Sequence, residues 1–162
     1  MKIKLLTKAV TLVALFSLFF GLVGCGEKTE YSGEIVSVST SCGHMDFSCS
    51  YSFYVVKKGE RWLLSADCAT DSESERIQLE DCPILEEDAK KLLSVLEASG
   101  EVSSLKGYRE PKLKIFVSDE TTYSSAVGFS NGETLFAKTK MSDEIVDYFY
   151  RLSKKYNKNE KN

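Results

Sequence analysis

Two runs of alternating residues joined by a short connection constrain the fold of this chain most strongly. Residues 51–56 and 61–66 place an apolar or aromatic side chain at every second position, and Lys57-Lys58-Gly59-Glu60 joins them. A glycine in a polar connection between two such runs is typical of a β-hairpin. If Lys58 and Gly59 form the centre of the turn, one apolar face results, with these opposite pairs: Val55 with Trp62, Phe53 with Leu64 and Tyr51 with Ala66.

Four cysteines follow Cys25, and the hairpin register bears on how they pair. The same register places Cys49 opposite Cys68, and opposite residues have Cβ atoms about 4.5–5.5 Å apart, close to what a disulfide spans. We therefore expect a disulfide between Cys49 and Cys68, which leaves Cys42 for Cys82. The alternatives are the nearest-neighbour pairs, Cys42 with Cys49 and Cys68 with Cys82, or four reduced thiols. A bulged turn at Gly59 would move the register by one residue.

Further strands are expected on both sides of the hairpin. Residues 33–40 predict a strand, and Ile77 and Leu79 alternate with polar residues in a fourth short one. Later in the chain, alternation predicts strands over residues 113–117 and 123–129. Asn131-Gly132 favours a tight hairpin turn that would make residues 134–138 one more strand, although a loop is the alternative there.

Two amphipathic helices are expected. Pro83 precedes the first, which runs from about Leu85 to Ala98 with one apolar stripe and ends before Gly100. The second begins after Ser142, whose hydroxyl suits a helix N-cap, and acidic residues follow in its first turn. The apolar stripes of the two helices are Leu85, Ala89, Leu92, Leu93 and Leu96, and Ile145, Phe149, Leu152 and Tyr156.

The order of these elements is strands, helix, strands, helix. It predicts an α+β fold in which an antiparallel sheet of about six to seven strands carries two helices packed on one face. Residues 33–156 are long enough for one domain with its own core, and residues 157–162 are expected to form a disordered tail.

The beginning of the chain has the pattern of a secretory signal peptide. Lys2, Lys4 and Lys8 provide the basic start, and a largely apolar run follows from Ala9 to Val23. As a helix this run would span roughly 22 Å, which is less than the ~30 Å hydrocarbon core of a bilayer. Residues 1–24 are therefore expected to be a signal segment rather than a permanent membrane helix.

Leu22-Val23-Gly24-Cys25 resembles the lipobox of bacterial lipoproteins. The resemblance implies that a diacylglyceryl group is attached to the Cys25 sulfur and that the chain is cut before Cys25. It also implies membrane lipid as a partner through Cys25, residues 25–32 as the anchor and tether, and a location on the extracytoplasmic side of the cell membrane. An ordinary signal peptide or a tilted membrane anchor, with Cys25 present by chance, are the alternatives.

The region after the lipobox is similar to uncharacterised lipoproteins of Gram-positive, clostridial-type bacteria. The similarity lies in a Tyr/Ser-rich hairpin, an acid-led helix and a strand that ends in Gly-Phe-Ser, here Cys49-Ser50-Tyr51-Ser52-Phe53, Glu86-Glu87-Asp88 and Gly128-Phe129-Ser130. This resemblance implies no activity and no site residues.

Charge argues against a nucleic-acid partner. The full chain has a formal net charge of −3. The signal segment holds three basic residues and no acid, so the remainder is more acidic still. A surface that binds phosphates needs a basic stripe, which this composition does not provide.

Catalytic and metal-binding patterns are weak. His44 is the single histidine, and a nucleophilic triad with Ser41 or Cys42 and with Asp46 would lie within one loop. A zinc site from Cys42, His44, Cys49 and one further cysteine has suitable ligand types but no paired Cys-x-x-Cys spacing. We therefore expect no catalytic residues, no metal and no cofactor.

The expected function is a binding module for an envelope protein or small ligand, and the alternative is a small envelope enzyme or metal protein centred on the Cys42–Cys49 loop with His44.

Overall fold

The computed structural model describes residues 31–43, 50–69, 76–109 and 121–160. In these residues the chain forms six strands and three helices. The predicted strand over residues 113–117, together with Cys25, His44 and Cys49, lies outside these ranges. The strands are β1 (Ile35–Gly43), β2 (Tyr51–Lys58), β3 (Arg61–Ala69), β4 (Arg76–Ile84), β5 (Thr122–Phe129) and β6 (Thr134–Ala137). The helices are α2 (Glu86–Ala98), α3 (Glu101–Gly107) and α4 (Asp143–Glu160).

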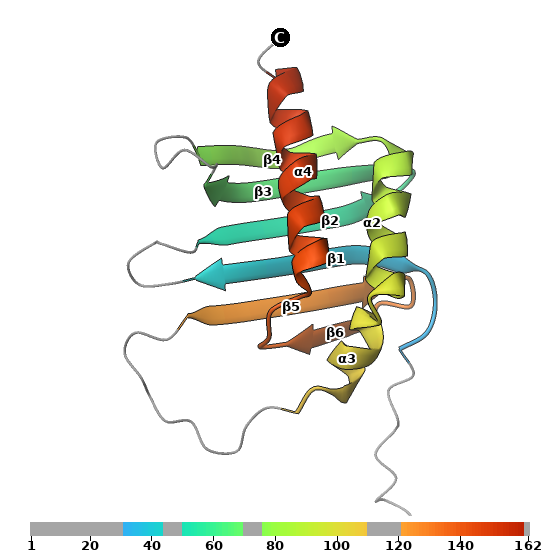
Figure 1. Ribbon diagram of the computed structural model, residues 1–162. Coiled ribbons are helices and arrows are strands. Elements are labelled where there is room, and N and C mark those ends of the chain that lie inside the picture. Colours follow the sequence, from blue (N-terminus) through green and yellow to red (C-terminus); the bar gives the residue numbers. More distant parts are fainter. Residues whose placement is uncertain (1–30, 44–49, 70–75, 110–120, 161–162) are drawn as a thin grey trace, which may run out of the picture. The chain divides into compact units, whose positions relative to one another are not determined.

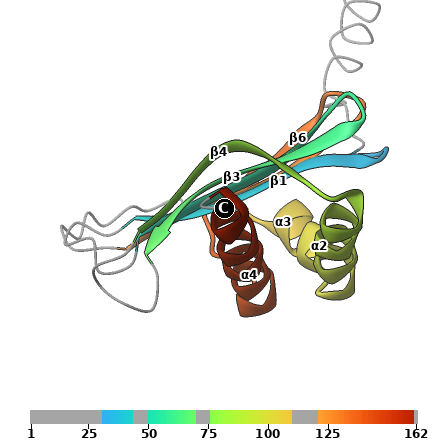
Figure 2. The same cartoon turned by 90° about the horizontal axis from the view of Figure 1, so that it is seen from above.

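The six strands form one antiparallel sheet in the order β4-β3-β2-β1-β5-β6 (Figure 1). The three described helices all lie on one face of this sheet, and Figure 2 shows none of them on the opposite face. The predicted α+β class is therefore confirmed, with six described strands and with α3 as an additional helix. Among the described residues, no helix has the length and the apolar sequence needed to span a membrane.

The hairpin of β2 and β3 forms as predicted, but its register differs by two residues. Lys58 pairs with Arg61, so Gly59 and Glu60 alone form the turn. Gly59 has a φ of +64°, which suits the first central position of a two-residue hairpin turn. The predicted pairs are therefore wrong, and the observed ones are Val55 with Leu64, Phe53 with Ala66 and Tyr51 with Cys68. A shift of two residues preserves the face, so the predicted apolar residues still face the core.

The remaining elements follow the sequence pattern, with one open choice decided and with two differences. Residues 134–137 form the strand that the sequence left open, paired with β5. Residues 101–107, for which the sequence pattern predicts no element, form α3, because Gly100 takes a left-handed φ of +69° and the next turn buries Leu105. The expected disordered tail is wrong for residues 157–160, because α4 continues to Glu160.

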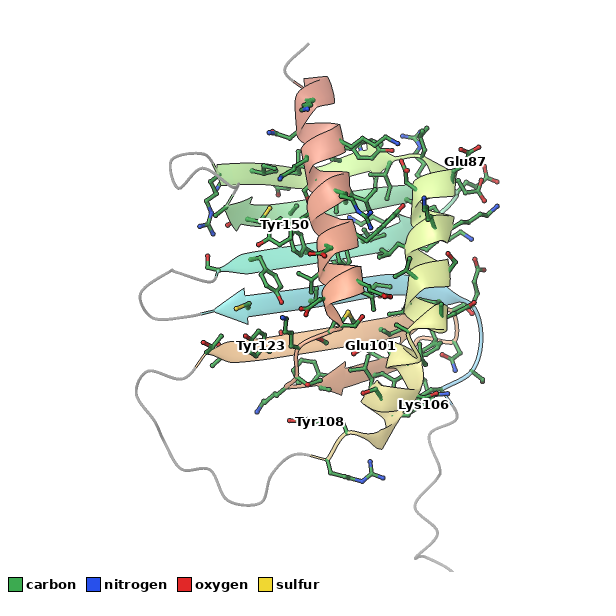
Figure 3. The ribbon with its side chains drawn as sticks, in the orientation of Figure 1. Glu87, Glu101, Lys106, Tyr108, Tyr123 and Tyr150 are labelled. Atoms are coloured by element: carbon green, nitrogen blue, oxygen red, sulfur yellow. The ribbon has the colours of Figure 1, made fainter. Side chains whose placement is uncertain are left out.

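The core lies between the sheet and the helices. Phe53 of β2 and Phe149 of α4 stack with ring centroids 5.2 Å apart and an interplanar angle of 3°. Tyr150 is also a residue of α4, and its ring, labelled in Figure 3, meets Phe53 edge-on at 5.0 Å. These aromatic contacts fix α4 across the strands.

Two hydrogen bonds join α3 to other parts of the chain, one to the residue before α4 and one to the segment before β1. Glu101, labelled in Figure 3, lies near the start of α4, and its Oε2 accepts a hydrogen bond from the backbone nitrogen of Ser142 at 3.3 Å. Lys106 of α3 donates to the carbonyl oxygen of Tyr31 at 3.2 Å. The segment that precedes β1 is therefore attached to α3.

The two outer strands differ in how they terminate the sheet. In β4, Asp81 takes a φ of +47° where the register with β3 shifts, and Pro83 lacks the N–H of a ladder bond. Acidic side chains, a bulge and a proline on an edge strand hinder pairing with a further strand. At the opposite edge, β6 has only four residues. Neither outer strand offers a long flat edge for another chain.

We expect Gly33→Ala to lower the free energy of unfolding by about 1–3 kcal/mol. Gly33 has a φ of +111°, and a Cβ there would lie 2.7 Å from the Oγ of Ser130. That Oγ accepts from the nitrogen of Glu34, so the substitution also disturbs the join between β1 and the β5–β6 turn. Gly107→Ala is the control, because a Cβ at Gly107 meets no atom within 4 Å. Urea denaturation measures both, and equal stabilities of the two variants would contradict the prediction.

Candidate functional site

The residues predicted for a loop-centred site do not converge in the part that the structure describes. Ser41 and Cys42 both belong to β1, and neighbouring residues of a strand point to opposite faces. Cys42 is buried on the helix side, whereas Ser41 lies on the opposite side. Among the described residues, no group of three or more metal-binding side chains is close enough to hold an ion. Asp46, like His44, falls outside the described ranges.

The sheet order contradicts the predicted disulfide between Cys42 and Cys82. Cys42 lies on β1 and Cys82 on β4, with β2 and β3 between them. Three strand spacings amount to about 14 Å, and a disulfide requires Cα atoms within about 7 Å. No disulfide joins Cys42, Cys68 and Cys82 to one another.

The other pairings are affected in different ways. Cys68 pairs with Tyr51, so the register that placed it opposite Cys49 is wrong, and Cys49 itself is not described. The nearest-neighbour pair of Cys68 and Cys82 fails, because Cys82 lies opposite Leu64, four residues along β3. Four residues of a strand span about 13 Å. Burial raises the pKa of the Cys68 thiol to about 11, so this thiol is a weak nucleophile near neutral pH.

Asp88 of α2 is the centre of a polar contact between the two long helices. Its Oδ2 accepts hydrogen bonds from the Tyr156 hydroxyl at 2.6 Å and from the Lys155 ammonium at 2.7 Å, both on α4. The Tyr156 oxygen in turn accepts from the nitrogen of Leu85 at 2.8 Å. These hydrogen bonds join α2 to α4.

A surface cavity of about 680 Å³ lies along α4. One apolar and one aromatic side chain line it together with two acids and two bases: Val95, Tyr150, Glu144, Asp147, Arg151 and Lys154. Ligand sites usually combine apolar walls with a few convergent polar groups. Because this lining is open and of mixed charge, it defines no particular ligand chemistry.

The face of the sheet opposite the helices has a more uniform composition. On β1, β2, β5 and β6, this face carries mostly small hydroxyl, glycine and alanine side chains: Ser37, Ser39, Ser41, Gly43, Ser52, Thr122, Ser124, Ala126, Gly128 and Thr134. Two aromatic rings project from it, Tyr54 with 40% and Phe136 with 58% of their surface exposed. We call the part of this face formed by these four strands the open face.

The register places the two rings in a single row across the open face. Phe136 pairs with Ala126, Ala126 with Ser39, and Ser39 with Tyr54. Paired residues in an antiparallel sheet point to the same side, so a floor of one alanine and one serine separates the rings. Three strand spacings place the two ring positions about 14 Å apart.

Hydroxyl groups flank this row on both sides. On one side Ser37 lies beside Gly128, and a Cβ added to Gly128 would come within 2.4 Å of the Ser37 Oγ, so the floor is tightly packed there. On the other side the hydroxyls of Ser41 and Ser124 hydrogen-bond to each other at 2.8 Å. A paired hydroxyl keeps further donor or acceptor capacity, so such groups can also bind a ligand.

Charged residues gather at the other half of the sheet. Asp67 of β3 forms an ion pair with Arg76 of β4, and Lys58 at the end of β2 forms one with Asp81 of β4 at 2.7 Å. Arg61 lies opposite Lys58 in the β2–β3 register and therefore on the same side of the sheet. The floor between Tyr54 and Phe136 consists of Ser39 and Ala126, so it carries no ionisable side chain.

The fold and this surface define the class of the molecule: an α+β domain whose described helices cover one face of a six-stranded sheet, and whose other face carries two exposed rings separated by a serine and an alanine. Comparisons of the chain with protein-family models, with curated proteins and with solved structures give no match. The assignment of a function therefore depends on the chemistry of the chain itself.

The sequence indicates parts of this surface but not the surface as a whole. Its one signal is the serine at every second position of β1, at residues 37, 39 and 41. Such alternation predicts one buried face and one polar face for a strand. It does not show that β5 and β6 continue this polar face, since their neighbours depend on the order of strands in the sheet.

Proposed function

We propose that this chain is a lipid-anchored, non-catalytic binding domain on the extracytoplasmic side of the cell membrane. The lipobox-like segment that ends at Cys25 supports the anchor. Five residues lie between Cys25 and Tyr31, and the six Cα–Cα steps that join these two residues reach about 21 Å when fully extended. A ligand or envelope protein bound by the domain would therefore be held near the membrane surface.

The open face is the observation that supports binding. A soluble domain usually leaves single apolar side chains exposed, and these need no explanation. Here two exposed rings share one row, with hydroxyl groups around them and none of the described helices over them. We assign the ligand surface of the proposed binding domain to this face.

The anchor is tested by the mass and the lipid content of the mature chain. We expect the parent protein to begin at Cys25 and to incorporate labelled palmitate, whereas Cys25→Ser incorporates none and retains residues 1–24. Gly24→Ala is the matched control, because it keeps a small residue before the cut and should be processed like the parent. Labelling of Cys25→Ser at the parental level, or a parent that retains residues 1–24, would refute the anchor.

A further inference from the structure

The row of rings on the open face has the chemistry of a carbohydrate site. The flat face of a sugar ring carries C–H groups that pack on an aromatic ring, and its edge carries hydroxyls that form hydrogen bonds. Tyr54 and Phe136 supply two aromatic rings about 14 Å apart along the row, and a short oligosaccharide spans that distance. The floor between them holds only Ser39 and Ala126, so a flat chain meets no bulky side chain there.

The distribution of charge selects the type of carbohydrate. An anionic ligand is held by Arg, Lys or backbone N–H groups, and the floor between the rings has no basic side chain. Lys58 and Arg61, the cations on this side at the β2–β3 turn, begin four residues from Tyr54 along β2, which is about 13 Å, and Lys58 pairs with Asp81. Glu80 lies on β4, two strand spacings or about 10 Å from β2, so its exposed carboxylate acts only weakly on a ligand that lies over the rings. The complementary ligand is therefore uncharged.

The edges of the sheet disfavour an extended peptide as the occupant. Peptides that bind sheets commonly add a strand to an exposed edge, where backbone hydrogen bonds provide the affinity. The β4 edge has a bulge at Asp81 and carries Pro83, and β6 has only four residues. The exposed aromatic groups lie on the face instead, where the backbone groups are already paired within the sheet.

We propose that the open face binds an uncharged, extended oligosaccharide, which stacks on Tyr54 and Phe136 and forms hydrogen bonds with the serine hydroxyls between and beside them. This inference deepens the proposed function, because it names the ligand class of the same face. Ring stacking provides most of the affinity, and the hydroxyls set the orientation of the sugar chain.

The test measures binding of neutral hexasaccharides of glucose and of N-acetylglucosamine by equilibrium dialysis. The full chain is kept in a zwitterionic detergent, whose head group contains no sugar. We expect saturable binding of at least one neutral hexasaccharide, about 3–10-fold weaker binding for Tyr54→Ala and for Phe136→Ala, and a larger loss when both are changed. Leu85→Ala is the matched control, because Leu85 is 60% exposed but lies at the start of α2, away from the open face. The affinity of this variant for the hexasaccharide should stay within about twofold of that of the parent.

Three results would overturn the proposal. The first is that neither neutral hexasaccharide shows saturable binding. The second is that Tyr54→Ala and Phe136→Ala bind as well as Leu85→Ala. The third is that an acidic oligosaccharide or a peptide binds more tightly than the neutral hexasaccharides and depends on the same two rings. Circular dichroism of each variant separates loss of the ligand surface from loss of the fold. Because the assay does not depend on lipid at Cys25, its failure leaves the anchor untouched, and failure of the palmitate labelling leaves this binding result untouched.

Discussion

Phe53→Ala should lower the free energy of unfolding by about 3–5 kcal/mol. Phe53 is 1% exposed and is the side chain of β2 on which α4 packs. Its ring stacks on Phe149 at 5.2 Å and meets Tyr150 edge-on at 5.0 Å, so the substitution leaves a cavity between sheet and helix. Urea denaturation followed by far-ultraviolet circular dichroism measures the change.

Phe136→Ala is the control for this prediction. This variant also loses a phenyl ring, but Phe136 is 58% exposed on its strand, so the free energy of unfolding should change by no more than about 0.5 kcal/mol. A similar loss in both variants would contradict the assignment of Phe53 to the core. The same measurement shows whether the Phe136 variant is folded when its ligand binding is tested.

Asp88→Asn should lower the free energy of unfolding by about 1–3 kcal/mol. The Asp88 side chain is 18% exposed, and its Oδ2 accepts from both Lys155 and Tyr156, so the amide loses the charge that strengthens both bonds. Glu86→Gln is the matched control in the same first turn of α2. The Glu86 carboxylate is 66% exposed and pairs with Lys90, so its loss should cost at most about 0.5 kcal/mol.

The same cluster predicts how stability depends on pH. Burial raises the pKa of Asp88, but hydrogen bonds from Lys155 and Tyr156 outweigh burial and hold this pKa below 3.8. A carboxyl group whose pKa is lower in the folded state stabilises the fold above its unfolded value, and this stabilisation is lost as the pH falls through the folded-state pKa. Asp88→Asn should therefore flatten the decrease in stability below about pH 4.

At alkaline pH the sign is reversed. Burial, and next the hydrogen bond to Asp88, raise the pKa of Tyr156 from 10.0 to about 12. A raised pKa gives stabilisation that is complete below pH 10 and is lost as the pH rises toward 12. Burial also raises the pKa of Tyr148, whose hydroxyl donates to the carbonyl oxygen of Asp88. Tyr156→Phe should remove part of the alkaline decrease, and an unchanged pH profile in this variant would contradict the contact.

Residue periodicity predicts the elements that depend on nearby residues. The apolar stripe of residues 85–96 predicts α2 because residues three and four apart share one side of a helix, and Ala89, Leu92 and Leu96 are buried. The β2–β3 hairpin is predicted by alternation in the same way. Its register is not, because a two-residue turn at Gly59-Glu60 and a four-residue connection leave the same residues on the apolar face.

Elements that depend on distant contacts are harder to predict. The short helix α3 has the polar residues of a linker, and it is stabilised by burial of Leu105 and by contacts with α2 and β6. The cysteine pairing fails for a related reason, because spacing along the chain does not show that β2 and β3 separate Cys42 from Cys82.

The sequence by itself determines the α+β class, the hairpin at its centre, the two long helices and the side of each strand that faces the core. The tertiary structure alone decides that β1 lies between β2 and β5, and this order unites Tyr54, Ser39, Ala126 and Phe136 in one row. The physical reason is the range of the interactions. Periodicity records which face of an element is buried, whereas the neighbours of a strand are chosen by the packing of the whole sheet against its helices.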